Sequence, residues 1–554
     1  MAILVVLFAF AAPSVSAAGN SIVITNTSSN VSIEGKTFDL YKVLNVSVSG
    51  TAYSYTVAPE FAPFSAAYET AHPSHTLVGD LGAAAANSAA LDAIATEIRA
   101  YILANASTVA AAKTTSSAVA AGTETVTVTG LALGYYIVTG EVTASGGTVI
   151  ATSAMTTTSS TADVGINVKA DAPKIEKKVW DVKESVDPDN TEAPRWQDVT
   201  DVNIGDTVKF LLTSNVPDAS KYDTYKFIMH DTMSAGLTLD STSFKVYVGG
   251  TKNAAAGITG GTQLTPVTDY VLSIPGTETG TKCSFEISFL KIKTYTKDLP
   301  IYVLYEAELN ASAVIYDPGN PNKVNLEYSN NPYDGGTGTN TTPDDHVVVY
   351  TFDNDLLKFA KDDAVTTDPT DPNLDIGEKA LAGAEFELYN GPASDSGRTK
   401  LAFVLDTAGT ATTAAIYRPA VVGDTATVTT TLVAPASGRI KILGIDEGVY
   451  SLKETKAPAG YTLLAAEIAI TIQIQYTFDE ENAYTGTPAT EKINTTLSAG
   501  GGKTQLQKIE NVGGSILPET GSIGTMIFTI GGITLMVLAG IILMVRRRKT
   551  ATSK

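Results

Sequence analysis

The sequence predicts an all-β protein of tandem β-sandwich domains, with one helical insertion in the first domain and a C-terminal transmembrane helix. Its 554 residues exceed the length of one ordinary domain. Thr, Val, Ala and Gly are abundant and only 17% of the residues are charged, a composition that suits pleated, half-buried surfaces. Alternating apolar residues, such as Phe285, Ile287 and Phe289, recur between turn residues.

The first 18 residues have the composition of a secretory signal peptide. An apolar run is followed by small residues, which predicts cleavage after Ala17 or Ala18. The usual positively charged start is missing, so Met1 could be internal to a longer natural signal. A buried strand or a membrane anchor is the alternative interpretation. We expect the chain to be exported.

Between this segment and the C-terminal tail we expect three β-domains. Their predicted bounds are 19–170, 171–350 and 351–514, followed by a tail over 515–554. The first domain has strand-like runs at Thr37–Val43 and Thr125–Thr129. Its Ala-rich stretch Gly82–Lys113 places Leu91, Ile94, Ile98 and Ile102 at near-helical spacing. We therefore expect one inserted helix and no other.

Charge and cysteine content exclude several functions. A net charge of −20 argues against nucleic acid as a partner and fits a soluble exported surface. Cys283 is the only cysteine, so no intrachain disulfide can form. The histidines (His72, His75, His230 and His346) show no metal-ligand spacing. We expect no metal, no cofactor and no enzyme acting on a soluble substrate.

The C-terminal tail has three parts in a fixed order. The pentapeptide comprises Leu517, Pro518, Glu519, Thr520 and Gly521. An apolar stretch from Ile523 to Val545 follows, long enough for a membrane-spanning helix, and then the basic cluster Arg546–Lys549. This arrangement resembles the LPxTG cell-wall sorting signal cut by sortases. The resemblance implies cleavage between Thr520 and Gly521 and transfer of the threonyl carbonyl to an amine.

Polar residues stand on strand faces that should be apolar in two of the predicted domains. Period-two alternation directs a lysine, an acid and an asparagine toward the core of each, in that order along the chain. They are Lys177, Asp231 and Asn322 in the second domain, and Lys358, Glu454 and Asn511 in the third.

These residues have two interpretations. One is a pair of buried or half-exposed ion pairs, which are often poor stabilisers. The other is an intramolecular isopeptide bond between lysine and asparagine. Burial lowers a lysine pKa and raises a carboxyl pKa, so a neutral amine could attack an amide polarised by the protonated acid. We favour the second interpretation and expect each crosslink to join the first and last strands of its domain, as disulfides would otherwise do.

Three segments resemble the major, or shaft, pilins of sortase-assembled Gram-positive pili. Tyr450–Tyr461 (YSLKETKAPAGY) is similar to the family's E-box, with Glu454 as its glutamate. Leu381–Tyr389 (LAGAEFELY) resembles the collagen-adhesin B-type domain, and Asn322–Asn331 with His230–Thr238 resembles the isopeptide-forming fimbrial domain. The resemblance implies immunoglobulin-like or collagen-adhesin-type sandwiches. It assigns no crosslink to the first domain.

Polymerisation of such pilins needs a nucleophilic lysine before the second domain. The segment Asn167–Lys174 (NVKADAPK) lacks the family's Tyr-Pro, but spacing from Lys177 favours Lys169. Lys174 is the alternative, and a solvated lysine without a role is a third interpretation.

We therefore expect the shaft subunit of a covalent surface pilus that supports adhesion. The expected partners are a pilus sortase, a housekeeping sortase, further copies of the chain, ancillary pilins, peptidoglycan and host surface receptors. The expected location is the cell wall, reached through a membrane-tethered precursor. A monomeric wall-anchored adhesin and an ancillary base or tip pilin are the alternatives, and a boiling-resistant ladder of polymers would distinguish them.

Overall fold

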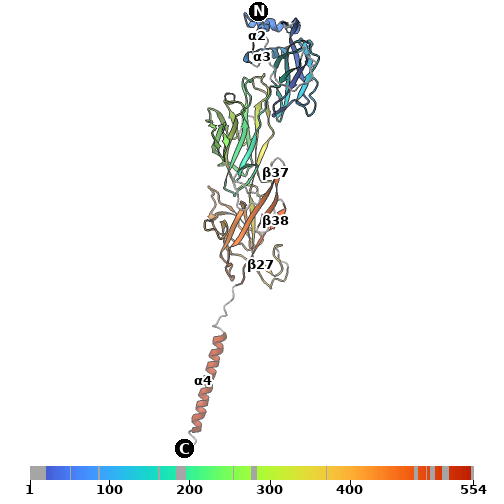
Figure 1. Ribbon diagram of the computed structural model, residues 1–554. Helices are drawn as coiled ribbons and strands as arrows, with labels where there is room; N and C mark the ends of the chain where they lie inside the picture. Colours follow the sequence, from blue (N-terminus) through green and yellow to red (C-terminus); the bar gives the residue numbers. More distant parts are fainter. Residues whose placement is uncertain are drawn as a thin grey trace.

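The computed structural model shows sheet-rich bodies in a row, followed by one long helix (Figure 1). It describes residues 20–550 except 50–51, 85–87, 152, 160–161, 182–194, 254, 276–282, 368, 370, 479–483, 494–495, 500–505 and 514–522. The described strands fall into three groups, β1–β10, β11–β25 and β26–β39, called here the first, second and third domains. The bounds predicted from the sequence remain a prediction.

The first domain pairs two sheets. A three-stranded sheet has the order β10-β1-β6, and a larger one is built on β2-β7-β3-β4 with β5, β8 and β9 at its sides. The strands are β1 (Ile22–Thr25), β2 (Val31–Ser32), β3 (Phe38–Ser49), β4 (Ala52–Val57), β5 (Lys113–Thr115), β6 (Thr125–Val128), β7 (Gly134–Ala144), β8 (Gly147–Ile150), β9 (Ala154–Thr157) and β10 (Val164–Asn167).

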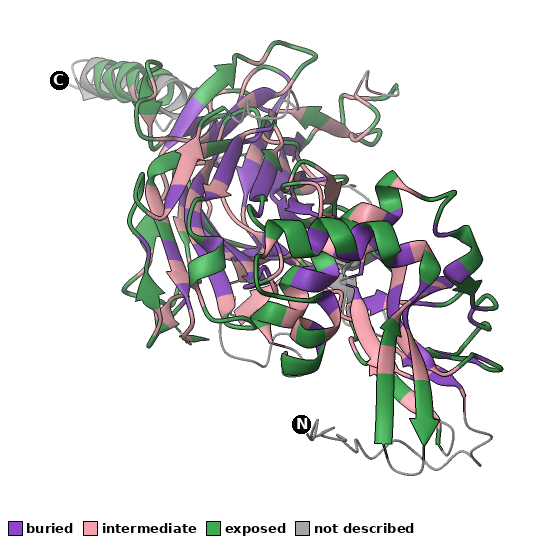
Figure 2. Ribbon diagram, turned by 90° about the horizontal axis from the view of Figure 1, so that it is seen from above, coloured by how far each residue is buried: buried purple, intermediate pink, exposed green. Residues whose placement is uncertain are grey.

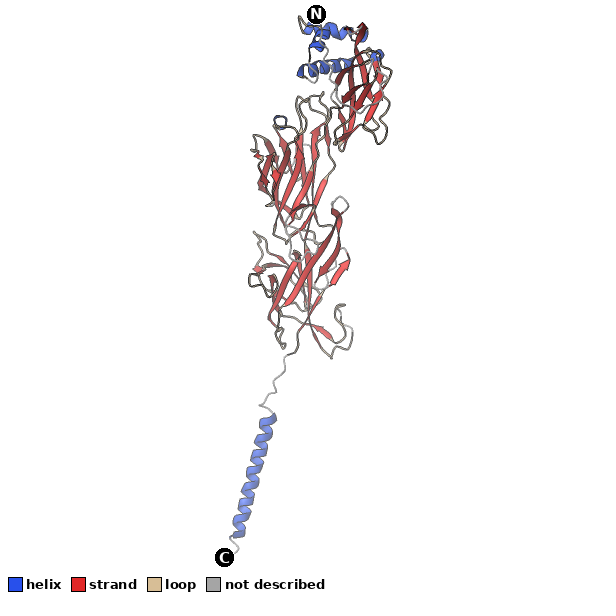
Figure 3. Cartoon of the chain, viewed as in Figure 1, coloured by secondary structure: helices blue, strands red, loops and turns tan. Residues whose placement is uncertain are grey.

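The helical insertion of this domain is larger than expected (Figure 3). Its elements are η1 (Pro59–Phe61), α1 (Ala62–Ala71), α2 (Leu77–Ala83), α3 (Ala89–Ala104) and η2 (Ala110–Ala112). The expected helix is α3, but the expectation of a single helix is wrong. α2 has only 7 residues and depends on its cap, because the Thr76 hydroxyl accepts from Gly79 N at 3.1 Å. Buried Phe61, Phe64 and Leu77 hold these short helices to the sheet.

The second domain is a sandwich of two large sheets. One has the order β12-β11-β14-β22-β16-β19, and the other has the order β13-β25-β23-β15-β21-β20, with β24 beside β23. Its elements are β11 (Glu176–Asp181), β12 (Arg195–Gln197), β13 (Val199–Asp201), β14 (Thr207–Asn215), β15 (Phe227–Met233), β16 (Leu237–Val248), β17 (Thr251–Lys252), β18 (Ile258–Thr259), β19 (Thr262–Gln263), β20 (Tyr270–Ser273), β21 (Phe285–Phe289), η3 (Ile292–Thr294), β22 (Pro300–Leu309), β23 (Asn320–Ser329), β24 (Thr339–Thr341) and β25 (Asp345–Tyr350).

The third domain is also a two-sheet sandwich. The sheet orders are β27-β26-β34-β31-β30-β32, with β39 beside β26, and β29-β28-β35-β36-β37-β38, with β33 beside β28. Its strands are β26 (Phe352–Lys361), β27 (Glu378–Ala380), β28 (Glu385–Asn390), β29 (Thr399–Lys400), β30 (Phe403–Thr407), β31 (Ala415–Pro419), β32 (Val428–Thr429), β33 (Leu432–Val433), β34 (Arg439–Ile445), β35 (Gly448–Lys456), β36 (Ile468–Phe478), β37 (Tyr484–Ile493), β38 (Thr496–Ala499) and β39 (Gln507–Glu510).

Buried residues lie mainly along the strands, while the helices of the first domain carry exposed residues on their outer faces (Figure 2). The strands alternate as predicted: along β14, Val208, Phe210 and Leu212 are buried, and Thr207 and Lys209 are exposed. One cluster of buried apolar residues extends from the first domain into the second, and another fills the third. This alternation directs the candidate residues into the cores.

Neighbouring domains are joined by direct contacts. At the first junction Ile150 N donates to Asn330 O at 2.9 Å, and the Arg99 guanidinium lies 4.3 Å from the ring centre of Tyr333. At the second junction Ile204 N donates to Gly444 O at 2.9 Å. Gly444 has φ +79°, and a Cβ there would lie 2.2 Å from Ile204 Cδ1, so this close approach requires glycine.

The C-terminal tail contains α4 (Ile523–Thr550), over the apolar stretch and basic cluster recognised in the sequence. Within the described part of the chain, no helix meets the combined requirements of length and hydropathy for crossing a membrane. The predicted signal peptide, residues 1–18, and the pentapeptide, residues 517–521, lie outside the described residues.

Candidate crosslinking sites

In the second domain the predicted lysine, acid and asparagine meet inside the sandwich. Lys177 on β11 comes from one sheet, whereas Asp231 on β15 and Asn322 on β23 come from the other. All three side chains are 0% exposed. Lys177 Nζ contacts Asp231 Oδ2 in an ion pair. The sequence had placed Asn322 on the last strand, but β23 is followed by β24 and β25, so that detail is wrong.

A buried tyrosine, Tyr305 on β22, links the three groups. The Tyr305 hydroxyl accepts from Lys177 Nζ at 2.6 Å and from Asn322 Nδ2 at 2.9 Å, and it donates to Asp231 Oδ2 at 2.8 Å. These three bonds use the single donor and both lone pairs of a hydroxyl. Tyr305 therefore holds the amine, the amide and the carboxyl at one point.

The surroundings of this site are dry and aromatic. The Tyr305 ring stacks on Phe210 and Phe244, with ring centres 5.2 and 5.5 Å away. Burial lowers the pKa of Lys177 and raises that of Asp231, and it raises the pKa of Tyr305 well above its ordinary value. The attraction between Lys177 and Asp231 opposes the first two shifts without cancelling them.

The third domain brings its own lysine, acid and asparagine together. Lys358 on β26 is 1% exposed, Glu454 on β35 is 4% exposed and Asn511 is 1% exposed. Lys358 Nζ lies 3.2 Å from Glu454 Oε1. Asn511 Nδ2 donates to Glu454 Oε2 at 3.1 Å. The carboxyl thus contacts both the amine and the amide.

Strand pairing explains why Asn511 reaches this site. β39 runs parallel to β26, with Lys358 opposite Ile509, and Asn511 N donates to Phe359 O at 3.0 Å just beyond the strand. The first and last strands of the third domain are therefore neighbours, as expected. Burial lowers the pKa of Lys358, whose Nζ lies 5.7 Å from the ring centre of Phe386.

Both sites contain buried polar atoms without a hydrogen-bond partner among the described residues. In the second domain they are Asp231 Oδ1 and Asn322 Oδ1. In the third they are Lys358 Nζ, Glu454 Oε1 and Asn511 Oδ1. Such orphaned groups are rare in folded proteins and call for a physical explanation. In each site the amide oxygen is without a partner among the described residues, whereas Lys358 Nζ and Glu454 Oε1 attract one another as an ion pair without hydrogen-bond geometry.

The two candidate linkage lysines have different surroundings. Lys169 follows β10, is half-buried, and has its pKa lowered by burial; Asp92 on α3 and Lys221 of the second domain are among the charges that act on it. Lys174 has an exposed side chain, and its carbonyl accepts from the Ser214 hydroxyl at 2.6 Å. Both lysines lie in the segment that joins the first two domains, and both remain candidates for the linkage.

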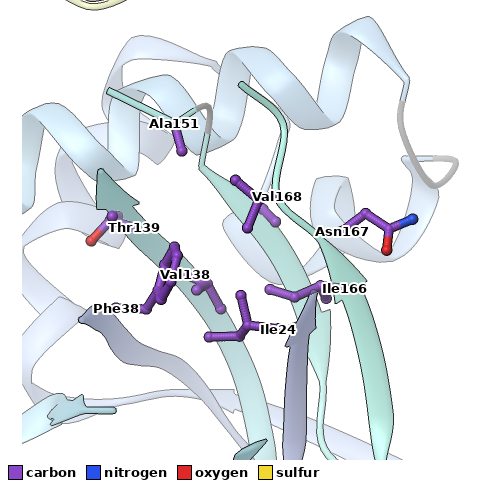
Figure 4. A pocket seen from close by; sticks show the side chains of 10 residues that line it. Ile24, Phe38, Val138, Thr139, Ala151, Ile166, Asn167 and Val168 are labelled. Atoms are coloured by element: carbon purple, nitrogen blue, oxygen red, sulfur yellow. The ribbon is translucent and has the colours of Figure 1, made fainter. Parts of the chain in front are cut away.

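A small apolar pocket adjoins this segment (Figure 4). Ile24, Phe38 and Val138 line it together with Asn167 and Val168, the two residues before Lys169. The Asn167 side chain points away from the apolar side chains. Val168, directly before Lys169, packs against the apolar core cluster.

Three family models match consecutive parts of the chain. They are the Gram-positive pilin backbone subunit 2, Cna-B-like domain over 204–332, a prealbumin-like fold domain over 373–485, and the LPXTG cell wall anchor motif over 513–551. The chain is a Gram-positive backbone pilin. It is the backbone subunit of a sortase-assembled surface pilus, anchored to the cell wall through its LPXTG motif. This confirms the shaft-subunit prediction over the adhesin and ancillary-pilin alternatives, and the matched families are not enzyme families.

This pilin is similar to a trypsin-resistant surface T6 protein of Streptococcus pyogenes serotype M6. The two are 25% identical over 445 residues, which cover 69% of this pilin and 70% of that protein. The solved T6 backbone pilin structure is 17% identical, with a TM-score of 0.49, and covers 89% of this pilin and 98% of that chain. The major pilin SpaD of Corynebacterium diphtheriae is 16% identical, with a TM-score of 0.44 and coverages of 90% and 98%.

Proposed function

We propose that this backbone pilin reinforces its second and third domains with one intramolecular isopeptide bond each. The bonds join Lys177 to Asn322 and Lys358 to Asn511, with Asp231 and Glu454 as the promoting acids. The observation that carries the proposal is that each lysine, acid and asparagine share one buried site in which the amide oxygen has no partner among the described residues.

In the second domain the reaction is an amide exchange. The neutral Lys177 Nζ attacks Asn322 Cγ, while the protonated Asp231 donates to Asn322 Oδ1 and stabilises the negative charge that develops on that oxygen. The Cγ–Nζ bond forms and the Cγ–Nδ2 bond breaks. A proton from the amine passes to Nδ2, which leaves as ammonia, so no other reactant is needed.

Enforced proximity replaces an external catalyst in this single-turnover step. Groups held in a reactive arrangement can reach effective molarities of about 10⁵–10⁸ M. Tyr305 supplies that arrangement, because its hydroxyl contacts the amine, the amide and the acid. Phe210 and Phe244 keep the site apolar, which favours the neutral forms of Lys177 and Asp231.

In the third domain Glu454 has the positioning role that Tyr305 has in the second. Its Oε2 accepts from Asn511 Nδ2 and from Leu464 N at 2.8 Å, and its Oε1 faces Lys358 Nζ. The hydrogen bond from Leu464 fixes the carboxyl between its two partners. Glu454 is therefore both the positioning group and the promoting acid.

A buried ion pair is the competing interpretation of each site. Such a pair pays a large desolvation penalty and is often no more stable than apolar residues of the same volume. It also leaves the oxygens of Asn322 and Asn511 unsatisfied. The isopeptide bond removes both buried charges and closes a covalent loop of roughly 150 residues in each domain, worth about 5 kcal/mol in a chain-entropy model.

For polymerisation we propose that a pilus sortase joins the Thr520 carbonyl of one subunit to the Lys169 amine of the next. The sortase would cut the Thr520–Gly521 bond and deliver the acyl group to the amine. Burial lowers the pKa of Lys169, which increases the fraction of nucleophilic neutral amine at neutral pH. The exposed Lys174 remains the alternative acceptor.

The remaining partners follow from this assembly scheme. A housekeeping sortase would transfer the last subunit to peptidoglycan, ancillary pilins would occupy the fibre ends, and the shaft would support adhesion to host surfaces. The signal peptide would direct export, and the tail around α4 would hold the precursor in the membrane until cleavage. Direct hydrogen bonds at both domain junctions suit a stiff shaft.

A ladder assay tests the linkage. Cell-wall extracts boiled in detergent should give a high-molecular-weight series for the wild type and for Lys174→Ala. Lys169→Ala should give monomer only, although its folded domains remain intact. A ladder that survives Lys169→Ala and disappears in Lys174→Ala would move the linkage to Lys174, and a ladder that survives the double variant would refute linkage through this segment.

A further inference from the structure

A second group of chemically reactive side chains lies on the opposite face of the strand that carries Asp231. His230, Cys283 and Glu286 each offer one donor atom, and these atoms lie within 4.8 Å of one another. All three residues are buried, with Glu286 at 0% exposure. The proposed crosslinking chemistry uses none of them.

Strand register brings this cluster together. β15 and β21 are antiparallel, with His230 directly opposite Glu286. Opposite residues project to the same face of a sheet, and successive residues project to opposite faces. His230 and Glu286 therefore face away from the Asp231 site, and Cys283 lies just before β21 on the same side. His230 comes from β15, whereas Cys283 and Glu286 come from the start of β21 and the residues just before it, so a search for spacing among the histidines does not detect the set.

Two of the three donor separations already suit a single ion. His230 Nδ1 lies 3.1 Å from Glu286 Oε1, and Cys283 Sγ lies 3.6 Å from the same oxygen. Atoms bound to one zinc ion at about 2.0–2.3 Å must lie within about 4 Å of one another. A small shift of these side chains would place three protein ligands around one ion and leave a fourth position for a water molecule.

The second nitrogen of His230 has the partner that a metal-bound imidazole requires. His230 Nε2 lies 3.3 Å from Glu327 Oε2, and Lys226 Nζ pairs with Glu327 Oε1 at 3.1 Å. A metal-ligating histidine usually donates its other N–H to a carboxylate, which fixes the tautomer and the ring orientation. Glu327 occupies that position, and Lys226 fixes Glu327.

We propose that His230 Nδ1, the Cys283 thiolate and a Glu286 oxygen bind one Zn²⁺ ion. Sulfur, imidazole and carboxylate ligands together favour zinc over the hard cations Ca²⁺ and Mg²⁺. The thiolate and the carboxylate balance the double charge of the ion, which suits a buried site. Binding releases the thiol proton to solvent, and no oxidant or reductant takes part.

The competing interpretation is a metal-free ion triad in which a protonated His230 lies between Glu286 and Glu327. In that triad the Cys283 thiol is only a weak hydrogen-bond donor, 3.4 Å from Phe285 O and 3.6 Å from Glu286 Oε1. Zinc binding involves all three side chains.

Cobalt titration of the purified, chelator-treated protein tests the proposal. Co²⁺ should bind in a one-to-one ratio with a thiolate-to-cobalt absorption band, and Zn²⁺ should remove that band. Cys283→Ser should lack the band, and Glu327→Gln should bind about 10- to 100-fold more weakly. His346→Ala, at an exposed histidine outside the cluster, is the matched control and should behave as wild type.

Circular dichroism should show that each variant is folded, and Zn²⁺ should raise the melting temperature of the wild type but not of Cys283→Ser. The absence of a thiolate band in the wild type, or equal zinc affinity in Cys283→Ser, would overturn the zinc site in favour of the ion triad. Intact mass reports the isopeptide bonds separately, so failure of this proposal leaves the crosslinks untouched.

Discussion

Replacing Asp231 by alanine should prevent the Lys177–Asn322 bond while leaving the amine and the amide in the second domain. Asp231 is the only one of the three groups that the product does not incorporate, so this variant isolates its promoting role. Asn322→Ala is the matched comparison, because it removes the bond but keeps the ion pair between Lys177 and Asp231. Exposed Asp344→Ala controls for the loss of an acid.

The expected loss follows from the loop that the bond closes. A covalent loop of roughly 150 residues is worth about 5 kcal/mol in the chain-entropy model. For a domain of this size each kcal/mol corresponds to about 2–4 °C, so the second-domain transition should fall by about 10–20 °C in both variants. The second-domain melting temperature should fall further in Asp231→Ala than in Asn322→Ala, because Asp231→Ala also leaves Lys177 buried without its acidic partner.

Intact mass spectrometry and calorimetry of the purified variants measure these effects. The wild type should be two ammonias lighter than its sequence mass, and each variant only one ammonia lighter than its own sequence mass, a difference of about 17 Da. The melting temperature of the third domain should not change. If Asp231→Ala kept the wild-type ammonia loss, the promoting role of Asp231 would be wrong. If Asn322→Ala melted at the wild-type temperature, the proposed Lys177–Asn322 bond would be refuted.

Three further results are expected. Glu454→Ala should retain one ammonia, about 17 Da, and lower only the third-domain transition, because its carboxyl contacts both Lys358 and Asn511; unchanged mass would contradict this role. Tyr305→Phe should slow crosslinking at least about tenfold in a mass time course after refolding, because its hydroxyl contacts all three groups and the loss of even one such hydrogen bond costs about a factor of ten; an unchanged rate would remove Tyr305 from the mechanism. Thr520→Ala should abolish wall anchoring and polymers in fractionated cells, and normal wall attachment would count against cleavage at that residue.

Much of the candidate site could be predicted from the sequence because strands obey a simple period. Lys177, Asp231 and Asn322 alternate in phase with apolar neighbours, and their side chains are fully buried in the structure. The same argument placed Lys358 and Glu454 inside the third domain. The strand predictions at Thr37–Val43 and Thr125–Thr129 correspond to β3 and β6.

Other features depend on contacts between segments that are distant in the sequence. The role of Tyr305 could not be predicted, because the use of its hydroxyl depends on which strands face one another. The histidine cluster was missed because His230 and Glu286 meet through strand register, 56 positions apart. The short helices α1 and α2 were missed because burial of Phe61 and Leu77 against the sheet stabilises them more than their own periodicity does.

Peptide mapping of the purified wild-type protein tests the central claim most directly. After complete protease digestion, mass spectrometry should find two branched peptides, one joining the Lys177 and Asn322 segments and one joining the Lys358 and Asn511 segments. The intact chain should be lighter than its sequence by two ammonias, about 34 Da. Linear peptides at all four positions, with the full unmodified mass, would contradict the self-crosslinking account.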